Sequence, residues 1–460
     1  MRFREALEHI KGLRHVLEEM AFSSSIGRLA LLDSSWLTNQ EEIEDALDEV
    51  AKFVGYINTT EGIPLLQLQL EEVVNIFGSI EVLRATGAIC SDVDLFEIKK
   101  LALIDEKIAQ IQAHYHYQLT ARPTLKGVLS VLDPREERLP SFYLDNYFDA
   151  SLKEIRDAIA RTKEDAPLAE LNAQLSQCEE AVRIRLTEEL APFADQLETV
   201  LKALAHDTAI LAKADWAVRY RACRPKPIPS GTTHLEELVN PEVSDQVARR
   251  GGRFQPVSIE FEGEPTLISG ANMGGKSVLL HSVALAQGMM QFGMYVLAKS
   301  ATMVVVEQLL YSAGDGEDIR MGLSSFGAEM IRLNGIIDAV KSGKKVLAII
   351  DEPARTTNPE EGYALVAGLV KLLEQYSATA LITTHYSGVP SQGRRWRVRG
   401  FMEDKDMQGV EVSHLADLMD YSLVPDSQDS VPREAFRIAR LLGVDEEFLD
   451  LSNKCFRTIV

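Results

Sequence analysis

The stretch Gly270-Ala271-Asn272-Met273-Gly274-Gly275-Lys276-Ser277 has the G-x-x-x-x-G-K-[ST] spacing of a phosphate-binding loop (P-loop, Walker A). Residues 266–269 (Thr-Leu-Ile-Ser) before it predict a short buried strand, and the apolar pattern over 278–290 after it predicts a helix. Glycines at such a turn let backbone N–H groups point at phosphate oxygens, and the helix N-terminus adds its positive dipole end. A strand, a glycine turn and a helix in this order predict a site for a nucleoside triphosphate.

The side chains of this loop have distinct expected roles. Lys276 would reach the β- and γ-phosphates, and the hydroxyl of Ser277 would ligate Mg²⁺. The other positions expected to bind the nucleotide are Gly270, Asn272, Gly274 and Gly275.

The composition is that of an ordinary globular protein with two or three domains. Of 460 residues, 46% are hydrophobic and 25% are charged, and no apolar run is long enough to span a membrane. The four cysteines are scattered, which predicts reduced thiols in a cytoplasmic protein rather than disulfides or a zinc site. The net charge of −21 argues against a surface that binds nucleic acid throughout, although a local basic groove stays compatible with it.

Residues 1–220 are predicted to be nearly all helical. Apolar residues recur at helical spacing over 43–57 and again over 70–83, and the stripe over 190–211 predicts a long helix with a coiled-coil-like seam. Three prolines between Cys223 and Gly231 then forbid a helix and predict an extended segment.

Beyond that segment the pattern changes from α to α/β. The apolar runs 346–350 and 379–383 predict buried parallel strands. Asp351 and Glu352 follow the first run, at the strand end where ligands bind in open α/β sheets. Asp351 would support the Mg²⁺, and Glu352 would orient or activate the attacking water.

His385 follows the second of these runs. At that strand end it would sense the γ-phosphate by a hydrogen bond, and a purely structural histidine is the alternative.

Ser324 and Ser325 open another predicted helix, upstream of Asp351. They would cap the helix N-terminus, with Glu329 close behind. Alternatively, as in one branch of phosphate-loop ATPases, they would contact the γ-phosphate bound by a second subunit. That alternative predicts a composite site that needs a homodimer.

Together these stretches resemble the ATPase domain of the MutS family of DNA mismatch repair proteins. The resemblance covers about residues 220–460 and, more weakly, 95–220. The residues that carry it are Gly270 to Ser277, Ser324 to Met330, Asp351-Glu352 and Thr384-His385-Tyr386.

The resemblance implies an α + α/β architecture in which a helical lever and core region precedes a P-loop (ABC-type) α/β ATPase domain. ATP and Mg²⁺ are the implied cofactors, and a homodimer with composite ATPase sites is the implied assembly. The implied domains are a helical N-terminal domain at 1–95, a helical core and lever domain at 96–220, and the ATPase domain with a C-terminal helical dimerisation region at 221–460.

The chain also departs from that family. Residues 353–359 form a proline-altered version of the family's glycine-containing loop, which weakens the case for communication between subunits through it. Phe3-Arg4-Glu5 matches the mismatch-reading pattern in its residue types only, because it lies at the start of a predicted amphipathic helix. A short helical stretch from Arg156 to Leu186 stands where the family inserts a DNA clamp, and the chain ends at Val460 without room for a nuclease tail. We therefore expect a short MutS-like protein without a mismatch reader or clamp.

One basic patch runs from Arg394 to Arg399, with Trp396 among the arginines. Such a patch would hold phosphates and stack bases. Alternatively, it would form a half-exposed edge strand whose arginines protect the sheet edge. Its place just after the His385 strand favours the edge strand.

The sequence therefore predicts a dimeric switch that binds and hydrolyses ATP, is related to DNA mismatch repair proteins and has DNA as one target. The long helix ending near Tyr220 would carry the nucleotide signal to the N-terminal half. The alternative target is a protein client, because some short MutS-like ATPases are associated with adenosylcobalamin-dependent aminomutases. The chain would then be an ATP-driven reactivase, or chaperone, of a metabolic enzyme. A transporter- or chromosome-type ATPase fits less well, because Ser-Ser-Phe stands in place of a glycine-rich signature.

Overall fold

The computed structural model describes residues 1–59, 61–270, 274–312, 325–401, 418–426, 436, 439–440 and 442–459. Contacts divide the chain into two compact units, neither of which is continuous in sequence. The predicted boundaries 1–95, 96–220 and 221–460 stay a prediction, since this grouping follows contacts rather than chain order. Unit 1 comprises Met1–Glu19, Ser35–Asp48 and Trp216–Val460, and unit 2 comprises Met20–Ser34 and Glu49–Asp215.

Unit 1 contains a six-stranded sheet with the strand order β10-β9-β4-β8-β7-β6. All neighbouring strands are parallel except β9 and β10, which are antiparallel. The predicted buried parallel strands at 346–350 and 379–383 are confirmed. The strands are β4 (Pro265–Ser269), β6 (Gln308–Ser312), β7 (Val346–Ile350), β8 (Thr379–Thr383), β9 (Arg395–Phe401) and β10 (Met419–Pro425).

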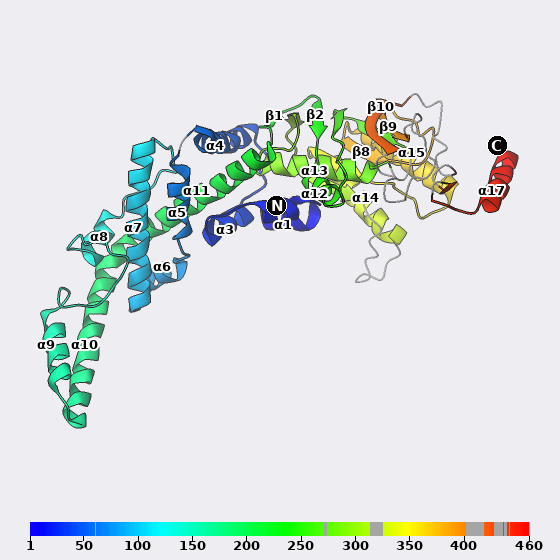
Figure 1. Ribbon diagram of the computed structural model, residues 1–460. Coiled ribbons are helices and arrows are strands. Elements are labelled where there is room, and N and C mark those ends of the chain that lie inside the picture. Colours follow the sequence, from blue (N-terminus) through cyan, green and yellow to red (C-terminus); the bar gives the residue numbers. More distant parts are fainter. Residues whose placement is uncertain are drawn as a thin grey trace. The chain divides into compact units, whose positions relative to one another are not determined.

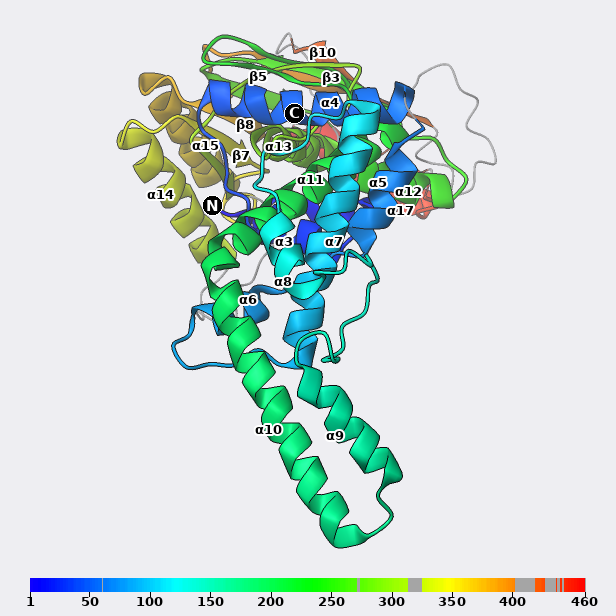
Figure 2. The same cartoon turned by 90° about the vertical axis from the view of Figure 1, so that its left-hand side faces the viewer.

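Helices cover both faces of this sheet. On one face, α14 (Ser325–Lys341) and α15 (Pro359–Gln375) share an apolar cluster with β4, β7 and β8. Because side chains alternate along a strand, the fully buried Ile349 and Leu381 point to the other face. There α13 (Lys276–Gln291) packs against β6 and β8. Figure 2 shows α14 and α15 on one flank of β7 and β8, with α13 on the other.

Two N-terminal helices of unit 1 cover α13. Nearly every residue of α13 is buried, so it needs apolar partners on all sides. α1 (Phe3–His9) and α2 (Leu13–Glu19) supply them, with the rings of Phe3 and Phe292 4.9 Å apart between centroids. Phe3 is fully buried in this packing, so it forms no exposed aromatic wedge.

A smaller four-stranded sheet in unit 1 has the order β1-β5-β2-β3. It includes the extended segment that the prolines predict, since β1 contains Pro227. Its elements are β1 (Lys226–Ile228), β2 (Thr233–Leu238), β3 (Val257–Phe261) and β5 (Ser300–Val304), with α12 (Pro241–Arg249) between β2 and β3.

Unit 2 is built of helices among its described residues. α9 and α10 form a hairpin whose helices lie side by side in both views (Figure 1 and Figure 2). Asp149 caps α9 by accepting a hydrogen bond from the Ser151 N–H at 2.9 Å. The helices are α3 (Ser25–Asp33), α5 (Ile63–Glu71), α6 (Phe77–Arg84), α7 (Asp92–Tyr115), α8 (Lys126–Leu132), α9 (Ala150–Arg161), α10 (Asp165–Leu190) and most of α4 (Gln40–Thr59) and α11 (Ala194–Tyr220).

Three expectations about individual elements need correction. The stripe over 70–83 is split, because α5 ends at Glu71 and α6 begins at Phe77. The predicted long helix over 190–211 begins only at Ala194, after a 3₁₀ turn that contains Pro192. The basic patch does form a strand, β9, but an edge strand is wrong, because β9 pairs with β4 and β10.

Across the part of the chain that the structure describes, none of the helices combines the length and apolarity that a membrane crossing requires.

Candidate nucleotide-binding site

The predicted phosphate loop lies between the end of β4 and the start of α13. Gly270 has φ +135° and Gly275 has φ +72°, conformations that favour glycine. A Cβ on Gly270 would lie 3.0 Å from the Val398 Cβ, so β9 also approaches the loop too closely for a larger residue. Gly274 is buried, and Asn272 lies outside the described residues.

Lys276, the first residue of α13, is buried to 3% side-chain exposure. Its Nζ donates to the Gly270 carbonyl at 2.8 Å and lies 3.4 Å from Glu352 Oε1. A buried ammonium needs such partners, because its desolvation is costly. Ser277 follows on the first turn of α13 and is exposed.

The two acids after β7 are tied to the end of β8 by one hydroxyl. Thr383 Oγ1 donates to Asp351 Oδ1 at 2.5 Å and accepts from the Glu352 N–H at 2.8 Å. Since β4, β7 and β8 are parallel, their carboxyl ends meet at one edge, where α/β sheets bind ligands. The structure therefore brings Lys276, Asp351 and Glu352 together. Thr383 was not singled out from the sequence, although it is the last residue of the predicted strand.

Burial and nearby charges shift the pKa values of two histidines at this edge. Burial lowers the pKa of His385, Lys276 and Arg355 lower it further, and Glu352 opposes them. Burial also lowers the pKa of His281 on α13 to about 4, and Asp351 opposes this shift. His281 was missed, since a histidine within an apolar helical pattern carries no sequence signal of its own.

Only part of the serine stretch lies within the described residues. Ser325 is the first residue of α14, whereas Ser324 lies outside the described residues. One turn further, Glu329 Oε1 accepts a hydrogen bond from the Ala354 N–H at 3.0 Å. Burial raises the pKa of Glu329, while this hydrogen bond and the charges of Arg332 and Arg355 oppose the rise. The serine helix therefore contacts the loop that follows Glu352.

A magnesium ion fits the donors at this edge. No group of three or more His, Cys, Asp and Glu side chains is gathered for a metal in the described ranges. Mg²⁺ in ATPases is held by one or two protein oxygens together with phosphate oxygens and water. The Ser277 hydroxyl and the Asp351 carboxylate are oxygen donors of this kind.

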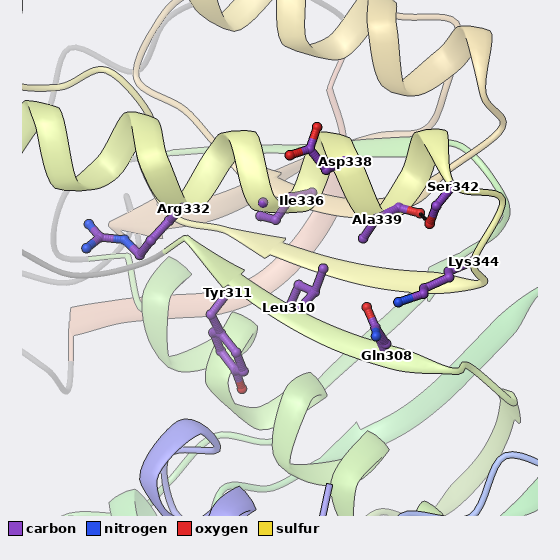
Figure 3. A pocket seen from close by; sticks show the side chains of 10 residues that line it. Gln308, Leu310, Tyr311, Arg332, Ile336, Asp338, Ala339, Ser342 and Lys344 are labelled. Carbon is purple, nitrogen blue, oxygen red and sulfur yellow. Dashed lines mark hydrogen bonds between the residues drawn. The ribbon is translucent and has the colours of Figure 1, made fainter.

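A cavity of about 480 Å³ lies away from these residues, between α14 and β6 (Figure 3). Leu310 and Ile336 face each other across it, whereas Tyr311 points away from α14. Lys276, Asp351, Glu352 and His385 do not line this cavity.

Two arginines of the basic patch, Arg394 and Arg399, pair with acids. Arg394 pairs with Glu260, and its Nε lies 3.4 Å from Glu262 Oε1. Arg399 lies 3.4 Å from Asp420 Oδ2. The Trp396 indole donates to the Glu260 carbonyl at 3.1 Å. These contacts neutralise part of the charge that the sequence displays there.

Part of the chain matches a known protein family, and much of it is similar to known proteins. Residues 266–420 match the family described as MutS domain V. The chain is 26% identical over 385 residues to the DNA mismatch repair protein MutS of Natronomonas pharaonis, covering 82% of this chain and 42% of that protein. It is 28% identical over 289 residues to the endonuclease MutS2 of Pediococcus pentosaceus, covering 60% of this chain and 34% of that protein. It is 31% identical over 262 residues to the endonuclease MutS2 of Lactobacillus acidophilus, covering 55% of this chain and 31% of that protein. The chain thus spans less than half the length of these relatives.

Proposed function

Because the chain belongs to the MutS family, we propose that it is an ATPase that binds ATP on residues 270–277 and hydrolyses it with the help of Glu352. The observation that carries this proposal is the position of Lys276. Its buried ammonium sits at the N-terminus of α13 and faces Glu352 at 3.4 Å. A buried cation at a helix N-terminus beside a glycine turn suits a polyanionic phosphate chain.

Each residue then has a defined task. Lys276 exchanges its contact with Glu352 for the β- and γ-phosphates, which leaves the carboxylate able to orient the attacking water and accept its proton. Thr383 holds the backbone N–H of Glu352 and the carboxylate of Asp351 in place. His385, whose pKa is lowered, is a neutral hydrogen-bonding partner for the γ-phosphate at pH 7.

Mg²⁺, held by Ser277 and Asp351 together with phosphate oxygens, would supply charge neutralisation at the phosphates.

We further propose that two copies of the chain complete each other's sites. Ser324 or Ser325 of the partner subunit would contact the γ-phosphate, and hydrolysis would release that contact. α11, which ends at Tyr220 and contributes residues to both units, would transmit the change. If ATP changed neither the oligomeric state nor the protease sensitivity near residue 220, this switch would be refuted.

The ATPase activity is tested by removing the loop lysine. Lys276→Ala should abolish nucleotide binding and reduce hydrolysis by roughly a hundredfold or more, because the phosphates lose their main cation. Lys299→Ala is the matched control, since Lys299 is exposed and pairs with Glu236 at 2.5 Å. Equal ATPase rates for wild type and Lys276→Ala would overturn the assignment.

The first candidate target is DNA, because a relative that covers most of this chain is named a DNA mismatch repair protein. The distribution of charge on this chain favours a second candidate, a protein client such as an adenosylcobalamin-dependent aminomutase. The α9–α10 hairpin, residues 150–190, carries nine carboxylates and six basic side chains, and Arg394 and Arg399 are paired with acids.

A binding titration at two salt concentrations separates the two targets. The probes are homoduplex, mismatched and branched DNA. Binding that weakens steeply with salt supports DNA, because phosphate contacts release counterions. Absence of binding to all three probes, at protein concentrations where ATP hydrolysis is measurable, supports the protein client.

A further inference from the structure

Ala354, two residues after Glu352, is held by hydrogen bonds on both sides. Its N–H donates to Glu329 Oε1 at 3.0 Å, and its carbonyl accepts from the Tyr386 hydroxyl at 3.1 Å. Glu329 belongs to α14, and Tyr386 follows His385 beyond the end of β8. This pair of hydrogen bonds, the Ala354 bridge, therefore joins α14 and the segment after β8 to the loop after β7.

The backbone of that loop is held in an unfavourable conformation. Glu352 has φ +46° and Ala354 has φ +58°, in the left-handed region that side chains with a Cβ disfavour. Pro353 between them has no N–H to donate. The loop is consequently anchored at the two neighbouring N–H groups, that of Glu352 on Thr383 Oγ1 at 2.8 Å and that of Ala354 on Glu329. These two anchors flank the position from which the Glu352 carboxylate projects.

Ala354 is also buried, with 1% exposure. It lies in the apolar cluster of α14, α15, β7 and β8, and Tyr386 packs against that cluster. Buried N–H and C=O groups are costly to leave without a partner. Loss of the Glu329 carboxylate or the Tyr386 hydroxyl therefore frees the loop to leave its left-handed conformation.

We propose that Glu329 and Tyr386 are positioning residues that set the Glu352 carboxylate by holding Ala354. Glu329 lies one helical turn after Ser325, so a shift at the start of α14 reaches Ala354 through a single hydrogen bond. Contact of this serine helix with the γ-phosphate in the partner's site thereby adjusts Glu352 in its own site. The inference rests on the proposed function, because Glu352 acts on water only there.

Steady-state ATP hydrolysis by the full chain tests the positioning role. Glu329→Ala and Tyr386→Phe should each lower kcat by roughly tenfold and leave KM and nucleotide affinity within about twofold, because only the placement of Glu352 changes. Glu329→Gln should restore most of kcat, because its amide oxygen still accepts from the Ala354 N–H. A residue needed only for folding would not show this split between kcat and KM.

Two variants serve as matched controls. Asp338→Ala removes a carboxylate from the same helix that accepts from Asn334 Nδ2 at 3.0 Å instead. Tyr363→Phe removes a hydroxyl that donates to the Gly388 carbonyl at 3.0 Å. Both should keep kcat within about twofold of the wild type, because neither side chain holds Ala354.

Amide hydrogen exchange of the nucleotide-free full chain tests the bridge without any activity. Exchange in residues 352–356 should accelerate by about tenfold in Glu329→Ala, and to a smaller extent in Tyr386→Phe, with protection of β7 and β8 unchanged. Protection equal to that of the wild type in Glu329→Ala would overturn the bridge, even if the wild type hydrolyses ATP. Faster exchange without a fall in kcat would overturn the positioning role. A wild type that neither binds nor hydrolyses ATP would refute the proposed function, while the exchange data would still decide the bridge.

Discussion

Both units of the chain bury charged side chains, but they arrange them differently. In unit 1, Lys276 faces Glu352 at 3.4 Å, and both lie at the carboxyl edge of the sheet. In unit 2, Arg122 Nε donates to Asp105 Oδ1 at 2.6 Å and its Nη1 lies 3.7 Å from Asp207 Oδ2. Asp207 also accepts from the Thr120 N–H and hydroxyl, at 3.0 Å and 2.7 Å.

The origin of the partners explains the difference. Asp105 and Asp207 project from the middle of α7 and α11, so the Arg122 cluster cannot separate without unpacking two helices. Lys276 and Glu352 project from the ends of elements, where one partner can be exchanged for a phosphate without loss of the core. The first arrangement holds a fold together, and the second is suited to binding a ligand. Four measurements test this contrast.

The largest effect is expected for Arg122→Met. The substitution leaves Asp105 and Asp207 buried without their cation and should cost about 3–5 kcal/mol of unfolding free energy. Chemical denaturation of the full chain measures the loss. Arg156→Ala, which breaks an exposed pair with Glu179 at 2.8 Å, is the control and should cost less than about 1 kcal/mol. Equal losses for the two variants would contradict a structural role for the buried cluster.

The second largest effect is expected on the rate of ATP hydrolysis. Glu352→Gln should reduce kcat by about a hundredfold to a thousandfold, because the amide cannot accept the proton of the attacking water. Its melting temperature should stay within about 3 °C of the wild type, because the amide oxygen can still accept a hydrogen bond from the Lys276 ammonium and the Glu352 backbone keeps its anchor on Thr383. Glu374→Gln is the control, because its amide oxygen can still accept the hydrogen bond that the Gln392 backbone N–H donates to Glu374. A large fall in melting temperature for Glu352→Gln would erase the contrast between the two clusters.

The third prediction concerns pH. Burial lowers the pKa of Lys213 in unit 2 to about 8, and Glu49 opposes this shift. The folded state then binds fewer protons than the unfolded state between pH 8 and the ordinary lysine pKa of 10.5. Stability attributable to Lys213 is therefore lowest below pH 8 and rises as the pH increases through that window, by up to about 3 kcal/mol.

Lys213→Met checks this prediction. Its unfolding free energy should depend less on pH than that of the wild type across the same window, because a methionine side chain at this position does not titrate. A pH dependence identical to that of the wild type would count against a buried, titrating Lys213.

The smallest effect is expected for His385→Asn. Asparagine keeps a hydrogen-bonding group at the strand end, so kcat should fall by roughly threefold to tenfold, or about 1 kcal/mol in activation free energy. The pH–rate profile below the ordinary histidine value of 6.5 should flatten in the variant if His385 senses the γ-phosphate. An unchanged rate and profile would leave His385 with the structural role that the sequence also allowed.

Much of the sheet was predictable because its strands are apolar on both faces. The runs at 266–269, 346–350 and 379–383 are short, have apolar residues at their centres and contain no charged residue, which is typical of buried parallel strands. Lys276, Asp351, Glu352 and His385 could be placed near one another for the same reason, since parallel strands end at a common edge. Of the two corrections to the helices, the one at residues 72–76 arose where the apolar spacing continues across a break, and the one at Pro192 arose although proline is a local helix-breaking signal.

Other features depend on contacts between distant segments. The packing of α1 and α2 on α13 and the Ala354 bridge join residues separated by 25 to more than 200 positions, and an edge strand could not be told from an interior strand without its neighbours.

The sequence by itself therefore determined the glycine turn of the predicted phosphate loop, the buried strands and the acidic and histidine side chains that follow them. Local spacing and hydrophobicity are enough to specify each of these elements. The tertiary structure alone decided that Thr383 links Asp351 to Glu352, that Lys276 is buried against Glu352 and that Ala354 is held in a left-handed conformation between Glu329 and Tyr386. These contacts join side chains and backbone groups from separate elements, and no pattern within a single stretch of sequence records which of them will meet.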